Sequence, residues 1–231
     1  MSRFFSLVTP AEGRERDAAH EWARAAYEDH QWLWHFFPAP AGSARDFLFR
    51  RRDGDGMPRY YVVSARPPEV PSAAWQAQTR AYAPRLHAGM RLAFDLRANP
   101  VTTLRSATGR AVRHDVVMHE KKRLLGEQGL ARWKDWPAAE RPALPDLIRD
   151  TCGAWLRERA ERLGCVFDDD VLMVEGYAQQ RGKNDDLRFS SVDFSGELTV
   201  TDATAFTAAL MLGVGHAKAF GCGLLLVKPL R

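Results

Sequence analysis

Two side chains that can move protons, Tyr27 and His30, lie three positions apart in a stretch of good helix formers. Residues with this spacing are neighbours on one face of a helix. Histidine gives or takes a proton near neutral pH, and a tyrosine hydroxyl can orient or activate a hydroxyl nucleophile. The pair therefore predicts general acid–base chemistry at a hydroxyl group. The aromatic run that begins at Trp32 leaves a second interpretation open, in which both residues only border an aromatic cluster.

Basic side chains concentrate in the middle of the chain. Residues 91–134 contain 10 Lys and Arg against 4 Asp and Glu, whereas the net charge of the whole chain is +4. Such a segment is typical of a surface that binds a polyanion, most simply a nucleic acid, and a solvated basic face is the alternative. The candidate phosphate contacts in this segment are Arg105, Arg110, Arg113, Lys121 and Lys122.

Residues 213–223, the glycine-rich loop, follow a predicted helix and precede a predicted strand. Glycine allows a backbone to approach phosphates closely, so Gly213, Gly215, Lys218 and Gly221 are further candidate contacts to nucleic-acid phosphates. An ordinary glycine-rich turn is the alternative interpretation. The loop lacks GxxxxGK[ST] and does not open a helix after a strand, which argues against a nucleotide-binding enzyme.

Other polar patterns give weaker indications. His35 lies near the end of the first predicted helix and is a candidate auxiliary phosphate contact or a surface histidine. Asp168–Asp170 would suit a metal-dependent nuclease, but consecutive residues point in different directions and favour a solvated turn. We therefore expect no metal and no cofactor. Three cysteines without a CxxC pair, and no membrane span or signal peptide, predict a cytoplasmic protein with reduced thiols.

The elements that must position these residues form two similar halves. Hydrophobic residues make up 45% of the chain and charged residues 27%, as in globular proteins. The Pro84–Gly89 segment is the best linker, which predicts domains at 1–88 and 89–231. In the first half we expect strands at 3–8, 47–51, 59–65 and 80–83 and helices at 18–36 and 72–78.

In the second half we expect strands at 90–98, 113–118, 171–179, 187–200 and 224–227 and helices at 120–136, 146–163 and 203–212, the last capped by Asp202. The first half has the order strand, helix, strand, strand, helix, strand, and the second half varies it. The fold class predicted is therefore α+β, with two tandem ferredoxin-like (RRM-like, βαββαβ) domains.

Several sequence blocks, in this order along nearly the whole chain, resemble one known family. They are YEDHQWLWHFFP at 27–38, RDFLFR at 45–50, LAFDLRANP at 92–100, and the glycine-rich loop running into LLLVKPL at 224–230. Each block alone is weakly specific, but together they are similar to the CasE family. These are the CRISPR-associated repeat endoribonucleases of the type I-E Cascade complex.

This resemblance implies a function and roles for the residues above. It implies cleavage of CRISPR precursor RNA at the repeat stem-loop, with Tyr27 and His30 as the catalytic pair and His35 near the place of a basic auxiliary residue in some relatives. The nucleophile would be the 2′-hydroxyl of the RNA, so no metal is required. The products would be a 2′,3′-cyclic phosphate or 3′-phosphate and a 5′-hydroxyl.

The resemblance also implies partners, namely the repeat hairpin of the precursor and mature crRNA and the other subunits of Cascade, and no membrane. The main alternative is a non-catalytic RRM-like RNA-binding protein, which would share the basic segment but would not need His30. The other two alternatives are the metal-dependent nuclease and the nucleotide-binding enzyme considered above.

Overall fold

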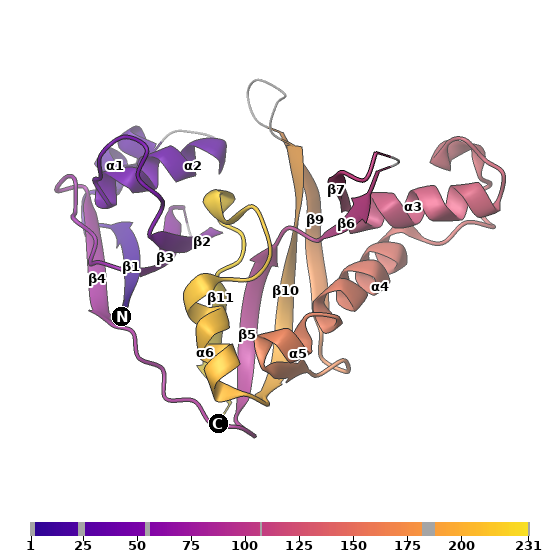
Figure 1. Cartoon of the computed structure of the whole chain (residues 1–231). Helices are drawn as coiled ribbons and strands as arrows, with labels where there is room; N and C mark the ends of the chain where they lie inside the picture. Colours follow the sequence, from indigo (N-terminus) through magenta and orange to yellow (C-terminus); the bar gives the residue numbers. More distant parts are fainter. Residues whose placement is uncertain (1–2, 23–25, 54–55, 107, 182–187, 231) are drawn as a thin grey trace. The chain divides into compact units, whose positions relative to one another are not determined.

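A computed structural model describes residues 3–22, 26–53, 56–106, 108–181 and 188–230, with only the backbone described at 26–28 and 30. The chain forms two compact units (Figure 1). The first comprises Met1–Leu86 with Thr207–Leu225, and the second His87–Phe206 with Leu226–Arg231. The predicted division into ferredoxin-like domains at 1–88 and 89–231 stays a prediction. It differs from these units in one segment, because it assigned 207–225 to the second domain.

The first unit is built on an antiparallel sheet with the strand order β2-β3-β1-β4. This is the order of a ferredoxin-like sheet. Its strands are β1 (Phe4–Pro10), β2 (Phe47–Asp53), β3 (Pro58–Ser64) and β4 (Trp75–Ala81). Large apolar side chains from these strands form the core, among them Val8, Phe49, Tyr60 and Trp75.

The first predicted helix is correct in type. Its described parts are α1 (Glu15–Trp22), α2 (Ala26–Leu33) and a final 3₁₀ turn, η1 (Trp34–Phe36). Leu33 and Phe36 are fully buried and join the core of the sheet. Hydrophobic contacts on this inward face therefore hold α2 and η1 against the strands.

The predicted helix at 72–78 is wrong, because this segment enters β4. Gln76 pairs with Thr9 of β1, and Trp75 is only 2% exposed while Gln76 is exposed. Trp75 and Ala77 both pack against the core, which is the period of two of a strand. Pairing with β1 thus outweighs the helix propensity of this short stretch.

The second unit has a main sheet with the order β11-β5-β10-β8, with β9 also paired to β10. These strands are β5 (Arg91–Ala98), β8 (Cys165–Phe167), β9 (Met173–Arg181), β10 (Arg188–Val200) and β11 (Leu225–Pro229). A separate antiparallel hairpin joins β6 (Val101–Arg105) to β7 (Ala111–Asp115). The strand predicted at 90–98 is confirmed, with its even-numbered residues buried from Leu92 to Ala98.

The helices of this part of the chain are α3 (Val116–Glu127), η2 (Trp133–Asp135), α4 (Leu144–Arg157), α5 (Ala160–Leu163) and α6 (Ala203–Leu212). The predicted strand at 113–118 is half wrong, because Asp115 accepts the Met118 N–H at 2.7 Å and caps α3. The Asp202 cap is confirmed, since its Oδ1 accepts the N–H groups of Thr204 and Ala205.

Candidate functional site

Helix α2 carries Tyr27 and His30, the predicted catalytic pair. The side chains of both residues lie outside the described part of the structure, so the pairing stays a prediction. What the structure does describe is the side of the helix that faces the core. Asp29, Leu33 and the following Phe36 are all buried, so α2 presents one carboxylate to the core together with its apolar side chains.

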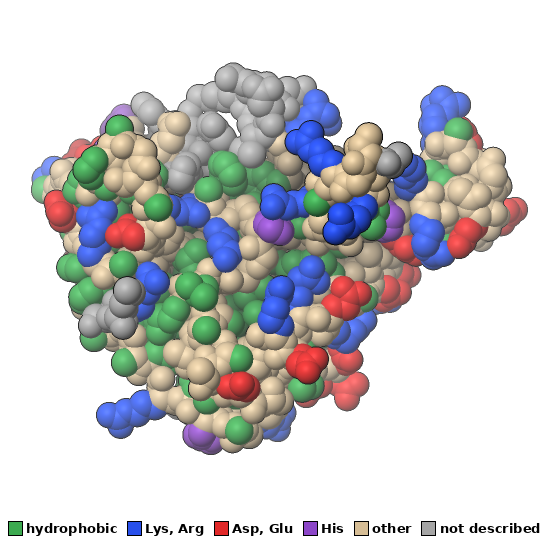
Figure 2. Space-filling model, viewed as in Figure 1, with side chains coloured by type: hydrophobic (Ala, Val, Ile, Leu, Met, Phe, Trp, Pro, Cys, Tyr) green, Lys and Arg blue, Asp and Glu red, His purple; other side chains and the backbone are tan. Residues whose placement is uncertain are grey.

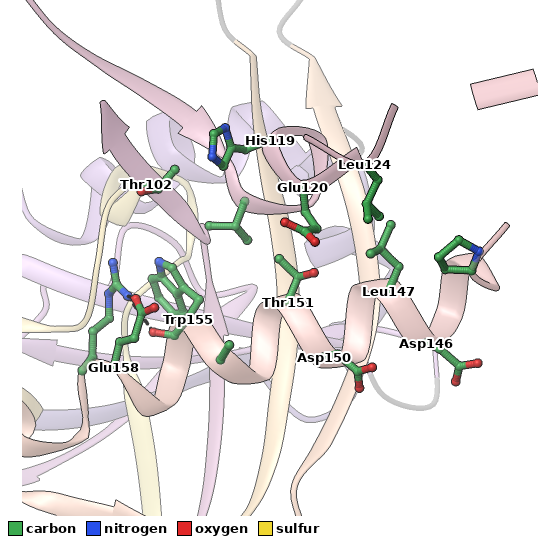
Figure 3. Close-up of a pocket in the computed structure, with 14 residues that line it drawn as sticks. Thr102, His119, Glu120, Leu124, Asp146, Leu147, Asp150, Thr151, Trp155 and Glu158 are labelled. Atoms are coloured by element: carbon green, nitrogen blue, oxygen red, sulfur yellow. Dashed lines mark hydrogen bonds and ion pairs between the residues drawn. The ribbon is translucent and has the colours of Figure 1, made fainter. Parts of the chain in front are cut away.

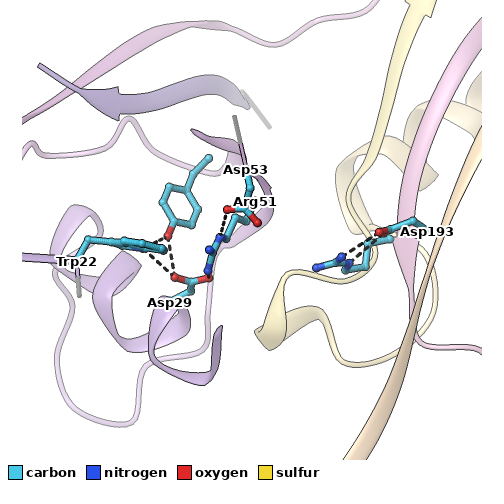
Figure 4. A network of polar contacts seen from close by, with 7 residues as sticks. Trp22, Asp29, Arg51, Asp53 and Asp193 are labelled. Carbon is cyan, nitrogen blue, oxygen red and sulfur yellow. Dashed lines mark hydrogen bonds and ion pairs between the residues drawn. The ribbon is translucent and has the colours of Figure 1, made fainter. Parts of the chain in front are cut away.

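A polar network surrounds that carboxylate (Figure 4). Asp29 Oδ1 accepts from the Tyr60 hydroxyl at 2.7 Å and from Trp22 Nε1 at 3.2 Å. Asp29 Oδ2 accepts from Arg51 Nη1 at 3.1 Å. The Arg51 guanidinium lies over the Trp22 ring, 4.5 Å from its centroid, and its Nε donates to Asp53. The network thus ties α2 to α1, β2 and β3.

The charges in this network stabilise one another. Burial raises the pKa of Tyr60, and the adjacent Asp29 carboxylate raises it further, so the phenol stays protonated and donates its hydrogen bond. Burial lowers the pKa of Arg51, but the Asp29 and Asp53 carboxylates outweigh burial and raise it above its usual value. Sequence reasoning missed these residues, although Asp29 falls on the same helical stripe as Leu33 and Phe36.

His35 lies in η1 with an exposed side chain. Its Nδ1 is 3.0 Å from the carbonyl oxygen of Trp32, within the same turn. The ring is thus accessible to a ligand, and its predicted role as an auxiliary phosphate contact stays untested.

The glycine-rich loop packs on β2 of the first unit. A Cβ atom on Gly213 would lie 2.9 Å from Leu48 Cδ1, and one on Gly221 would lie 3.0 Å from the Phe49 ring. The Lys218 ammonium donates to the Leu212 carbonyl at the end of α6, at 2.7 Å. Close packing against β2 therefore accounts for Gly213 and Gly221, while the predicted RNA contacts of Gly213, Gly215, Lys218 and Gly221 stay a prediction.

This packing predicts that Gly213→Ala destabilises the protein more than Gly109→Ala. Both glycines have a φ of +76°, so both alanines would be strained, but a Cβ on Gly109 meets nothing within 4 Å. The added overpacking at Gly213 should cost about 1–3 kcal/mol. Urea unfolding of the two variants measures the difference, and equal losses would contradict the packing explanation.

The β6–β7 hairpin presents the predicted arginines to solvent. Arg105, Arg110 and Arg113 are all exposed. Arg105 pairs with Ala111 and Thr103 pairs with Arg113, so Arg105 and Arg113 lie on the same face of the hairpin. Lys and Arg side chains gather over this hairpin in Figure 2. The structure thus brings these arginines together on one projecting element.

The basic residues of α3 differ in availability. Lys122 is exposed, whereas Lys121 is partly buried with its Nζ 5.1 Å from the centroid of the Trp133 ring. Burial lowers the pKa of Lys121. Arg123 forms ion pairs with both Glu120 and Glu127. Of the two lysines predicted to contact phosphate, Lys122 is therefore the more accessible.

A cavity of about 590 Å³ lies between α3 and α4 (Figure 3). Its lining includes the carboxylates of Glu120, Asp146, Asp150 and Glu158 and the guanidinium of Arg159. An excess of carboxylates repels phosphate, so this cavity is unsuited to the RNA backbone.

Two side chains of the Asp168–Asp170 run make local contacts within the protein. Asp168 Oδ1 accepts the N–H of Asp170, and Asp169 is paired with Arg157. No cluster of three or more His, Cys, Asp or Glu side chains suited to a metal ion occurs among the described residues. The cysteines are buried, and burial raises the pKa of Cys152 and Cys165 to about 12, which makes both poor nucleophiles.

Comparison with known proteins then places the chain. A family model described as "CRISPR associated protein" matches residues 4–229. The chain belongs to this family. Over 216 residues it is 31% identical to the CRISPR system Cascade subunit CasE of Escherichia coli K12, which covers 92% of this chain and 96% of that protein.

Other members of the CRISPR-associated family also match. The chain is 33% identical over 150 residues to the CRISPR-associated endoribonuclease Cse3 of Thermus thermophilus, covering 63% of this chain and 59% of that protein. A solved structure of Thermus thermophilus Cse3, bound to an RNA representing a pre-cleavage complex, has a TM-score of 0.67 and 24% identity, covering 99% of this chain and 100% of that one.

Two predictions are confirmed by these matches. The resemblance to the CasE family is correct, and so is the α+β fold class with two ferredoxin-like domains. In addition, no helix within the described residues has the length and apolar character needed to cross a membrane.

Proposed function

We propose that this chain is a metal-independent endoribonuclease that cleaves CRISPR precursor RNA at the repeat stem-loop to give mature crRNA. The observation that carries this proposal is the 31% identity to the Cascade subunit CasE over 92% of the chain. The exposed arginines of the β6–β7 hairpin support it, because phosphate recognition needs accessible guanidinium groups. The protein would act in the cytoplasm and stay bound to its product as a Cascade subunit.

The chemistry proposed uses a nucleophile that the RNA supplies. The 2′-oxygen attacks the adjacent phosphorus and loses its proton, the bond from phosphorus to the 5′-oxygen breaks, and that oxygen gains a proton. In this scheme Tyr27 orients or activates the 2′-hydroxyl, and His30 serves as general acid or base. The products are a 2′,3′-cyclic phosphate, or the 3′-phosphate formed from it by water, and a 5′-hydroxyl.

The test is to incubate the purified protein with end-labelled repeat RNA in EDTA and to map the ends. We expect one cut with a 5′-hydroxyl end, and none when the ribose at that position is 2′-deoxy. Cleavage that needs added Mg²⁺ would overturn the proposal in favour of a metal-dependent nuclease. Tight binding without any cut would favour the non-catalytic RRM-like RNA-binding protein.

A further inference from the structure

The buried carboxylate of Asp29 has no part in the chemistry proposed above. Its residue is 4% exposed and directly precedes His30 in α2. Burying an ionised carboxylate costs several kcal/mol unless hydrogen bonds compensate for the lost water. An apolar residue at position 29 would fill this face of the helix without that cost. The carboxylate at position 29 therefore suggests that its hydrogen bonds have a purpose beyond filling the core.

Each donor to Asp29 comes from a different element of the first unit. Tyr60 belongs to β3, Arg51 to β2 and Trp22 to the end of α1. Apolar contacts alone let a helix roll or slide slightly with little loss of buried area. Hydrogen bonds are directional, so three of them from three elements fix both the rotation and the axial position of α2 at Asp29.

Helix geometry relates that anchor to the predicted catalytic pair. Each residue turns an α-helix by about 100°. Position 30 therefore lies about 100° from Asp29 around the axis, and position 27 lies about 160° from it. When Asp29 is held inward, position 27 is held on the side of α2 that faces away from the core. Position 30 is held at the flank of the buried face, about 60° around the axis from the buried Leu33.

We propose that Asp29 is a positioning residue for the cleavage reaction, which holds α2 in the rotation at which Tyr27 and His30 meet the RNA. The inference rests on the proposed function, because it assumes that this pair acts on the scissile ribose and phosphate. A displacement of reacting groups by about 1 Å can cost about 100-fold in rate. Loss of the anchor should therefore slow the chemical step and leave RNA affinity unchanged.

The test uses Asp29→Asn, which keeps the size of the side chain but removes the charge that pairs with Arg51. At saturating protein we expect the single-turnover cleavage rate to fall about 10- to 100-fold. The Kd for an uncleavable 2′-deoxy hairpin should change less than about twofold. Tyr60→Phe removes the bond from Tyr60 to Asp29 and the hydroxyl that accepts from Trp22 Nε1. It keeps the pair between Asp29 and Arg51, so it should give a smaller fall. The double variant should be no slower than Asp29→Asn, since both act through one anchor.

A matched control separates positioning from lost stability. Val62→Ala removes volume from the same core without touching a polar group of the network, since Val62 is fully buried. Assayed well below the melting temperatures, Val62→Ala should cleave at the wild-type rate. The inference is overturned if Asp29→Asn cleaves like the wild type, or no more slowly than an equally destabilised Val62→Ala.

Tyr60→Phe keeps the test decisive if Asp29→Asn does not fold, because a wild-type rate in Tyr60→Phe then counts against the anchor. His30→Ala is measured in parallel. An inactive His30→Ala beside an unaffected Asp29→Asn would refute only the role of Asp29. A His30→Ala variant that cleaves normally would instead refute the assignment of the catalytic pair in the proposed function.

Discussion

Replacing His30 with alanine is expected to lower the single-turnover rate of repeat RNA cleavage by about 10²–10⁴-fold, the usual loss when a positioned general acid or base is removed. Binding should persist, because the proposed phosphate contacts lie on other elements such as the β6–β7 hairpin. Cleavage at saturating protein and the Kd for an uncleavable 2′-deoxy hairpin, measured on the same preparation, separate the two effects.

His20→Ala is the matched control for this prediction. His20 is an exposed histidine of the first unit, in the last turn of α1, and it has no role in the proposed chemistry. Its substitution should leave cleavage and binding at the wild-type level. If His30→Ala weakened binding as much as cleavage, the residue would be a contact to RNA and not the general acid or base.

Removing Arg105 and Arg113 together is expected to weaken hairpin binding by about tenfold or more and to reduce its dependence on salt. Each phosphate contact contributes about 0.7–0.9 to the slope of log K against log salt concentration. Loss of two contacts should therefore lower the slope by about 1.5. The slope is measured by titrating labelled RNA between low and physiological salt, and cleavage at saturating protein should be retained.

Arg123→Ala provides the comparison within the same basic segment. Arg123 is held by Glu120 and Glu127, so its charge is already compensated within α3. We expect its removal to leave the salt slope unchanged. An unchanged slope in the Arg105 and Arg113 double variant would place the hairpin outside the RNA interface.

Local patterns allowed much of the fold to be predicted from sequence. The strict alternation of Leu92, Phe94, Leu96 and Ala98 identified β5, and Asp202 identified the start of α6. The segment Trp75–Ala81 was not predictable in this way, because its alanine and glutamine residues suit a helix as well as a strand. Its structure depends on pairing with β1, which is distant in sequence.

In the candidate site, too, residues related by local spacing could be predicted, whereas contacts between distant segments could not. Tyr27 and His30 could be proposed from spacing within one helix. The bonds of Asp29 to Arg51 and Tyr60 could not, because these partners lie 22 and 31 residues away and meet only when β2 and β3 are in register. The glycines at 213 and 221 were recognisable as sites of close approach, but which surface they approach, here β2, follows from tertiary structure.

The first unit is not continuous in sequence, and this has a consequence for biosynthesis. Residues 207–225 complete it only after residues 87–206 of the second unit have been translated, and their 3₁₀ turn η3 (Lys218–Phe220) contacts α2 and β2. A nascent chain that ends before residue 207 would therefore leave Leu48 and Phe49 without the neighbours supplied by this segment. The helix that carries Tyr27 and His30 thus obtains this packing partner only when residues 207–225 have been synthesised, so a product truncated before residue 207 would lack the contact between η3 and α2.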